Sequence, residues 1–453
     1  MSSLQLKRID ARSADANQEL QALRDQLSPS GNVVSPKGKA LTERVFGQPL
    51  LPTQVVERIC QDVRSRGVEA LLHYSQQLDG ATLTSGSLRL PLDKLQQAHQ
   101  AATPEFLRCI RKIRSNIDSF QRSILHQNVN HQPAPGIQLQ HRYQPLRRVG
   151  VCVPGGAAAY PSTVLMTVVP AQAAGVAEIA VVAPPTPFGA YNPDVLATCY
   201  ELGITQVYPI GGAQAVAALA YGVDGLPAVD KIVGPGSLFV ALAKKYVYGE
   251  VDIDSIAGPS EVVVIADHST SPAFAAADIL AQAEHSPGAS LLITWHGELL
   301  DQVESELQRQ LEGLSRGQLT VESLNAFGAL ILVRDSQQAV ELTNWIAPEH
   351  LHIACSQPGE LSTKIRNAGA TFLGPFSPVA LGDYAAGPSH VLPTGGTARW
   401  AAGLSSNSFL RSNSVIEYSK EALAEIAGEI AVLADKEGLT AHRESVNIRL
   451  RTP

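Results

Sequence analysis

The sequence has few aromatic and few charged residues for its length. Aromatic residues make up 5% and charged residues 17% of the 453 positions, whereas hydrophobic residues make up 45%. This composition excludes a disordered chain and is typical of an α/β protein rich in small aliphatic side chains. A chain of this length exceeds what one hydrophobic core usually supports, so we predict two or more domains.

The cysteines are scattered and odd in number, and no two of them form a CxxC pair. This pattern argues against a cysteine-ligated metal and favours reduced thiols in the cytoplasm. The first residues contain no apolar run typical of a signal peptide, so we expect a cytoplasmic protein. Two of the thiols, Cys152 and Cys355, lie within apolar runs, where a cysteine is more often a small buried hydrophobe than a nucleophile.

The chain also lacks positive charge and uninterrupted apolar helices. A net charge of −7 and a pI near 6.0 provide no basic surface, so we expect no nucleic-acid partner. Residues 150–177 carry no charge, but Pro154, Pro161 and Pro170 interrupt any helix that could span a membrane. We therefore read this segment as a strand, a turn and a buried helix, and we expect no membrane partner.

Short β-branched runs alternate with helical patterns over most of the chain. Residues 52–124 are helical in pattern, and four strand–glycine–helix units follow between residues 149 and 249. A second series of such units begins at SEVVVIAD, residues 260–267. The alternation predicts an α/β fold with two incomplete Rossmann-like, doubly wound domains and parallel sheets, plus small N-terminal and C-terminal helical segments.

We expect the chain to divide into four parts. The N-terminal segment covers 1–45, and the first Rossmann-like domain combines 46–150 with 262–405. The second Rossmann-like domain covers 151–261, and a C-terminal helical segment covers 406–453. The last segment has a single apolar stripe at helical spacing, so it must cover either its own body or a partner.

Three glycine-rich turns follow strands of the first βα series. They are PGG at 154–156, IGGAQ at 210–214 and GPGS at 234–237, and none of them is a complete GxGxxG fingerprint. Each turn alone is more typical of a tight structural connection. Three of them in one sheet favour a phosphate-bearing or otherwise polar ligand at its carboxyl edge.

Several polar side chains allow both a functional and a structural reading. Gln282 and His285 lie three apart on a predicted helix, where they could face a metal or where the imidazole could cap the helix. The adjacent Glu349 and His350 follow Pro348 at a helix-to-strand connection, and they could serve one site only if the turn is bent. Pairs of the same ambiguous kind are Asp383 with His390 in a Gly/Pro/Ser-rich loop, and Glu437 with His442 near the C-terminus.

Taken together, the motifs resemble the histidinol dehydrogenase family from about residue 150 to the C-terminus. The chain contains them in the family's order: VPGGAAAYPSTVLM, IGGAQAVAALAYG, VDKIVGPG, AGPSEVVVIAD, ILAQAEH, IAPEHLHI, LGDYAAGPSHVLPT and EGLTAH. The resemblance implies oxidation of L-histidinol to L-histidine through L-histidinaldehyde, the last steps of histidine biosynthesis, with two NAD reduced. It also implies an intertwined homodimer with shared active sites.

The resemblance assigns roles to particular residues. It implies one Zn²⁺ per active site, held by Gln282, His285, Asp383 and His442, the last from the other subunit. It implies that Glu349 and His350 are the acid/base pair, with His350 as the base for the alcohol and Glu349 activating a water for the aldehyde step. The implied substrate-binding residues are Ser260, Gln282, His285, His350, Asp383, His390, Glu437 and His442.

Two departures from the family's commonest pattern concern NAD. The residue before VPGG is often Tyr and is Cys152 here, and the residue after GPG is often Asn and is Ser237 here, whereas Gln214 is retained. Three alternatives stay open on the sequence: a related dehydrogenase of another small polar alcohol, a zinc hydrolase that uses Glu349, and a binding protein that does not use the cofactor.

Overall fold

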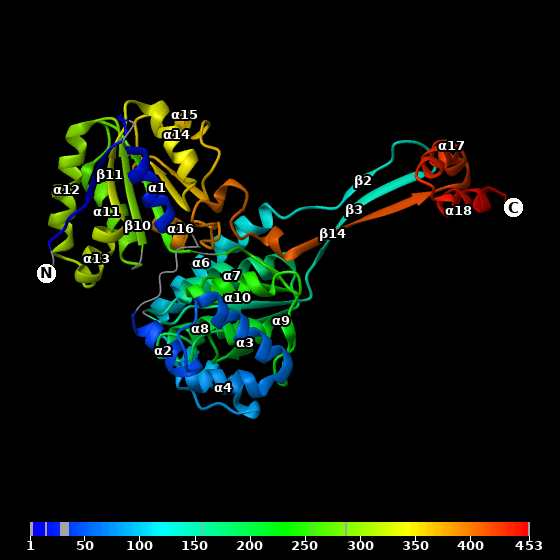
Figure 1. The fold of residues 1–453 in the computed structure, drawn as a ribbon, viewed down its shortest axis with the longest axis horizontal. Helices are drawn as coiled ribbons and strands as arrows, with labels where there is room; N and C mark the ends of the chain where they lie inside the picture. The colour runs from blue at the N-terminus through cyan, green and yellow to red at the C-terminus, as the bar shows by residue number, and fades with distance from the viewer. Residues whose placement is uncertain are drawn as a thin grey trace.

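The computed structural model describes residues 3–13, 16–27, 36–156, 158–256, 258–285 and 288–451. Figure 1 shows two α/β bodies side by side and an arm that projects from them and carries the C-terminus. Parallel sheets form the centre of both bodies, as the alternating pattern predicts. Among the described residues, no helix is long and apolar enough to cross a membrane.

The first body is built on a six-stranded parallel sheet in the order β1-β11-β10-β9-β12-β13. Helices α1 and α14 pack on one face, and α11, α12 and α13 pack on the other. The strands are β1 (Lys7–Asp10), β9 (Ser260–Ala266), β10 (Gly288–Thr294), β11 (Gly328–Leu332), β12 (His350–Ile353) and β13 (Ala370–Leu373). The helices are α1 (Ala16–Leu27), α11 (Pro272–Ala283), α12 (Gly297–Leu311), α13 (Gly317–Phe327), α14 (Ser336–Ile346), α15 (Pro358–Ser362) and α16 (Ala380–Tyr384).

The second body contains a five-stranded parallel sheet in the order β6-β5-β4-β7-β8. Its four βα units confirm the predicted alternation, including the strand, turn and buried helix expected between residues 150 and 177. The strands are β4 (Arg148–Cys152), β5 (Glu178–Val182), β6 (Gln206–Tyr208), β7 (Lys231–Val233) and β8 (Asp252–Ile253). The helices that follow the first four are α7 (Pro161–Ala174), α8 (Pro193–Glu201), α9 (Gly212–Tyr221) and α10 (Leu238–Val247).

The helices before β4 pack on this second body. Apolar residues of α3 and α4 share a buried cluster with α9 and α10, and those of α5 and α6 share one with α7 and α8. The structure therefore groups them with the five-stranded sheet and not, as we expected, with residues 262–405. The reason is that their apolar stripes find partners on the helices of that sheet. Their bounds, with that of α2, are α2 (Pro36–Phe46), α3 (Pro52–Arg66), α4 (Val68–Asp79), α5 (Leu92–Ala101) and α6 (Pro104–Ser123).

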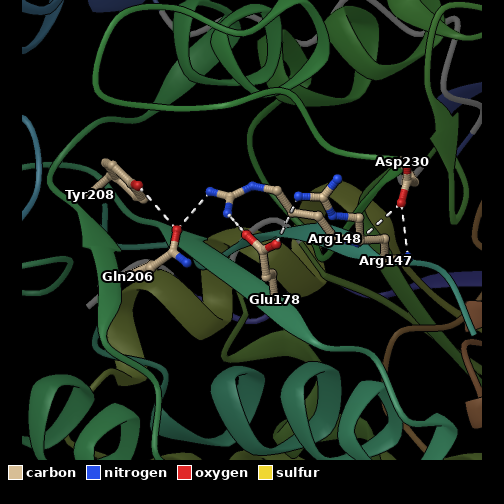
Figure 2. Close-up of polar contacts among 6 residues, drawn as sticks. All are labelled: Arg147, Arg148, Glu178, Gln206, Tyr208 and Asp230. Atoms are coloured by element: carbon tan, nitrogen blue, oxygen red, sulfur yellow. Dashed lines mark hydrogen bonds and ion pairs between the residues drawn. The ribbon is translucent and has the colours of Figure 1, made fainter.

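A polar cluster ties the amino ends of the second sheet together (Figure 2). The buried Arg148 at the start of β4 donates to Glu178 at 2.6 Å and to Gln206 at 2.7 Å, at the starts of β5 and β6. Asp230, just before β7, accepts from the backbone N–H groups of Arg147 and Arg148, both at 3.0 Å. The cluster fixes four neighbouring strands at the edge opposite the glycine-rich turns.

The arm consists of an antiparallel sheet and two terminal helices (Figure 1). Strand β3 (Ile137–Pro145) pairs along its length with β14 (Leu410–Tyr418) and also with β2 (Val129–His131). The helices α17 (Lys420–Lys436) and α18 (Thr440–Arg451) follow. The C-terminal segment is thus a strand and two helices, and β1 and α1 of the N-terminal segment belong to the first body.

Candidate active site

Glu349 and His350 lie at a sharp bend between α14 and β12. Helix α14 ends at Ile346, and Ala347 then adopts a left-handed conformation with φ of 53°, unusual for a residue other than glycine. Strand β12 begins at His350, so the turn is bent as a shared site requires. Because His350 pairs in register with Val262 of β9, the two side chains lie at the amino end of β9, beside Ser260 and Glu261.

The Glu349 carboxylate is buried and held by two donors. The Ser260 hydroxyl donates to its Oε2 at 2.5 Å, and the Glu261 backbone N–H donates to the same oxygen at 2.9 Å. Both contacts favour the ionised form, but burial outweighs them and raises the pKa of Glu349 to about 7. A carboxylate with this pKa exchanges protons near neutral pH, as a group that activates water must.

Glu261 is a second buried carboxylate that the sequence analysis did not identify. Its Oε1 accepts from the backbone N–H of Glu349 at 3.2 Å and from that of Gly395 at 3.0 Å. Burial and the like charge of Glu349 raise the pKa of Glu261 to about 8. Glu261 thereby joins the Glu349 bend to the loop that follows His390. In the sequence, only the position of Glu261 next to Ser260 in the AGPSE motif indicated that it could belong to the site.

His350 is a buried imidazole with one ring nitrogen unoccupied. Its Nδ1–H donates to the Glu261 carbonyl at 3.2 Å, so the neutral ring carries its proton on Nδ1 and leaves Nε2 free to accept one. Nε2 has no hydrogen-bond partner in the described part of the chain, and it lies 3.7 Å from Asp383 Oδ1. Burial lowers the pKa of His350 although the Asp383 carboxylate opposes the shift, and the neutral imidazole is thereby favoured.

Two of the three metal-ligand candidates from this chain, Asp383 and His285, lie near His350. Gln282 lies buried in the last turn of α11, and its side-chain nitrogen has no hydrogen-bond partner in the described residues. Burial and the charge of His350 lower the pKa of His285, while burial raises the pKa of Asp383. An amide, an imidazole and a carboxylate are donors that fit a divalent cation, although Gln is a rare ligand. Within the described ranges, no three His, Cys, Asp or Glu side chains are grouped so that they could hold a metal ion.

Two cavities are lined by residues of this candidate site. A cavity of about 630 Å³ is lined by His350 and His390, and one of about 520 Å³ is lined by His285 and Asp383. The Asp383 carbonyl accepts from His390 Nδ1 at 3.0 Å, and burial lowers the pKa of His390 to about 4, which keeps it neutral. The second cavity is also lined by residues 158–162, which follow the PGG turn of the five-stranded sheet. The segment after the PGG turn, His285 and Asp383 therefore border the same space.

The cofactor candidates lie along the carboxyl edge of the five-stranded sheet. Cys152 ends β4, Ser237 is the exposed residue before α10, and Gln214 is buried in the first turn of α9. Gly234 has a φ of 103°, and a Cβ there would lie 2.2 Å from the Cys152 carbonyl oxygen, so only glycine fits. Gln214 donates to Asp79 at 2.9 Å, and its Oε1 has no partner in the residues that the structure describes. Burial raises the pKa of the Cys152 thiol to about 12, which opposes a thiolate role.

Glu437 and His442 are not brought into this site by their own chain. Glu437 caps the end of α17 and His442 lies in α18, and both side chains are exposed. Figure 1 shows these helices at the end of the arm, away from both bodies. The arm leaves large apolar side chains in solvent, with Val432 61% and Leu433 64% exposed.

Both the sequence and the fold are similar to those of known proteins. The family model for histidinol dehydrogenase matches residues 51–450. A histidinol dehydrogenase of Rhodopirellula baltica is 62% identical over 98% of this chain and 97% of its own length, and one of a Synechococcus species is 47% identical over 87% and 91%. The crystal structure of histidinol dehydrogenase from Elizabethkingia anophelis superposes with a TM-score of 0.87 at 31% identity, covering 100% of this chain and 99% of that one.

Proposed function

This chain belongs to the histidinol dehydrogenase family, and from that membership we propose that it oxidises L-histidinol to L-histidine through L-histidinaldehyde, using Zn²⁺ and two NAD. Membership makes the chain an oxidoreductase of histidine biosynthesis. The observation that carries the finer proposal is the unoccupied Nε2 of the neutral His350, 3.7 Å from Asp383 and beside the buried Glu349.

His350 takes the alcohol proton in the first oxidation. Its Nδ1–H is held by the Glu261 carbonyl, so Nε2 is the atom that accepts the proton from the substrate hydroxyl. The lowered pKa of His350 keeps Nε2 unprotonated at neutral pH. Asp383, close to Nε2, stabilises the imidazolium that results from the transfer. NAD, when bound, would accept the hydride from the carbon that bears this hydroxyl.

Glu349 serves the second oxidation, in which water must add to the aldehyde carbon. Its Oε2 is occupied by Ser260 and the Glu261 N–H, which fix the carboxylate and leave Oε1 to accept a proton from water. Since no thiol is needed for this addition, the buried Cys152 and Cys355 can remain structural.

The ligand set requires a second copy of the chain. Gln282, His285 and Asp383 would hold Zn²⁺ together with His442 of a second copy, and Glu437 of that copy would contact the substrate. When bound, the cation supplies positive charge that orients the substrate and stabilises developing negative charge on oxygen. The exposed apolar side chains on the arm support this arrangement, because an arm that crosses to another body would cover them. We therefore propose a homodimer with shared active sites.

The glycine-rich edge of the five-stranded sheet would hold NAD. The tight approach at Gly234 and the unpartnered Oε1 of Gln214 fit a ligand that approaches the backbone closely. Cys152 lacks the aromatic ring of the Tyr that is common at this position in the family. Ser237 has a shorter side chain than the common Asn, but its hydroxyl can donate and accept a hydrogen bond.

We predict that each L-histidinol yields two NADH and one L-histidine, and that a chelator abolishes turnover until zinc is restored. The measurement is NADH absorbance against histidine formed, with and without chelator. A single NADH per histidinol would indicate a dehydrogenase that stops at the aldehyde. Turnover that persists at full rate after the metal has been removed would contradict the zinc assignment.

We also predict that the two oxidations depend on pH differently. Because Glu349 has a pKa of about 7 and works as the carboxylate, aldehyde oxidation should rise with pH through about 7 and fall roughly tenfold per unit below it. His350 has a lowered pKa, so alcohol oxidation should keep its rate to lower pH. Single-turnover rates with histidinol and with histidinaldehyde across pH 5 to 9 would check this. If both rates fell together below about pH 6, the roles of Glu349 and His350 would be contradicted.

A further inference from the structure

A buried ion pair between Asp278 and His352 joins α11 to β12. His352 Nδ1 lies 2.6 Å from Asp278 Oδ2, with Asp278 4% and His352 1% exposed. His352 Nε2 lies 2.8 Å from the Gly374 carbonyl oxygen. The Nε2 contact is a hydrogen bond, whereas the Nδ1–Asp278 contact is a close ion pair without hydrogen-bond geometry in the described residues. Burial alone would lower the pKa of His352, but the adjacent Asp278 carboxylate and the Gly374 carbonyl raise it overall, which favours the charged imidazolium beside Asp278.

The surroundings of the pair are apolar. Val264, Ile279 and Val379 belong to one buried cluster around it, and Phe372 packs against that cluster. Replacing a buried ion pair with well-packed apolar residues is often neutral or stabilising, so stability alone gives little reason for charges here. What such a pair does supply is a defined distance and direction between the elements that it joins.

The pair joins three elements, each of which carries an active-site residue. Asp278 lies one helical turn before Gln282 on α11, so the two side chains share a face of that helix. His352 follows His350 by two residues on β12 and therefore points to the same side of the sheet.

The third element is α16. Asp278 uses its other oxygen, Oδ1, to accept from the backbone N–H of Val379 at 3.3 Å. Val379 is the residue before α16, which carries Asp383. One carboxylate thus contacts β12 with one oxygen and the start of α16 with the other.

We propose that Asp278 and His352 are positioning residues that set the separation of Gln282, His350 and Asp383, and thereby preorganise the metal site. The inference rests on the proposed function, since it assumes that Gln282 and Asp383 hold a cation. Loss of the Asp278 carboxylate frees the start of α16 and leaves His352 without its counter-charge. Replacing residues that contact the metal ligands, and not the metal itself, typically lowers metal affinity by about 10–100-fold.

The test measures zinc affinity of the full-length protein by competition with a chromogenic chelator, together with the melting temperature of the metal-free protein. We expect Asp278→Ala to weaken zinc binding about 10–100-fold. Asp278→Asn should retain most of the affinity, because its amide oxygen can accept from Val379 while its NH₂ donates to a neutral His352. Retained zinc affinity in Asp278→Asn would show that the contacts of this side chain, and not its charge, position the site.

Arg148→Met is the matched control. It removes a buried charge from the other sheet (Figure 2) and should lower the melting temperature while zinc affinity stays unchanged. If Asp278→Ala does not fold, His352→Gln replaces it. The single amide nitrogen of glutamine cannot take the place of two separate ring nitrogens, one near Asp278 and one near Gly374, so zinc binding should again weaken. Wild-type affinity in the folded variant, with zinc bound by the wild-type protein, would overturn this inference alone. A wild-type protein that binds no zinc would overturn the proposed function as well.

Discussion

Replacing His350 by glutamine is expected to slow both oxidations by about 10²–10⁴-fold, the usual effect of removing a general base. The neutral ring holds its proton on Nδ1 through the Glu261 carbonyl and presents a bare Nε2, which no glutamine atom can replace as a base. Because the base accepts a proton in the first oxidation and remains beside the substrate in the second, both rates should fall. Single-turnover rates with histidinol and with histidinaldehyde measure the two separately.

Glu349→Gln is the matched comparison for this prediction. The amide oxygen of glutamine can still accept from Ser260 and from the Glu261 N–H, so the bend should be preserved. Alcohol oxidation should therefore continue, while aldehyde oxidation slows for want of a group that activates water. An equal loss of both oxidations in Glu349→Gln would show that its role is misassigned. A His350→Gln protein that oxidises histidinol at the wild-type rate would remove His350 from the reaction.

The parallel strands and their helices could be predicted from the sequence because each has a strong local pattern. VGVCV and SEVVVIA are continuous β-branched runs, and in the structure they become β4 and β9, which are almost fully buried. Gly438 follows α17 with a φ of 71°, a left-handed conformation that glycine commonly adopts just after a helix.

Other elements could not be predicted because they are stabilised by distant segments of the chain, which a local sequence pattern does not reveal. Strand β3, IQLQHRYQP, is partly exposed along its whole length and is defined by its pairing with the distant β14. Strand β1 has four residues and is stabilised by pairing with β11, more than three hundred positions away. The stripe on α3 predicts burial but does not reveal which sheet receives it, so the expected grouping with residues 262–405 failed.

The same limit applies to the site. The proposed catalytic pair and the proposed ligands belong to motifs that the resemblance identified, but no sequence pattern indicates the residues that contact them. Glu261, Asp278 and His352 are charged side chains within apolar segments, a pattern that equally fits a solvated face. Only the tertiary structure shows that all three are buried and hydrogen-bonded or ion-paired to residues near Glu349, His350 and Asp383.

Two inactive variants should restore activity when they are combined in one dimer. We expect His350→Gln and His442→Asn each to inactivate the homodimer, because each shared site lacks either its base or its ligand. In the heterodimer, the intact body of the His442→Asn chain receives the intact arm of the His350→Gln chain. One site of the two is then complete, so the purified heterodimer should show about half of the wild-type activity per dimer.

The chain offers a matched control for this experiment. His350→Gln combined with Glu349→Gln places both changes in the bodies, so no arrangement of arms completes a site for both oxidations, and histidine formation should stay low. Co-expression of the two chains with different tags allows each heterodimer to be purified and assayed for histidine formed. No recovery in the first pair would mean that His442 serves its own chain or none. Because the exposed Val432 and Leu433 at the end of the arm need a surface to cover them, we expect recovery.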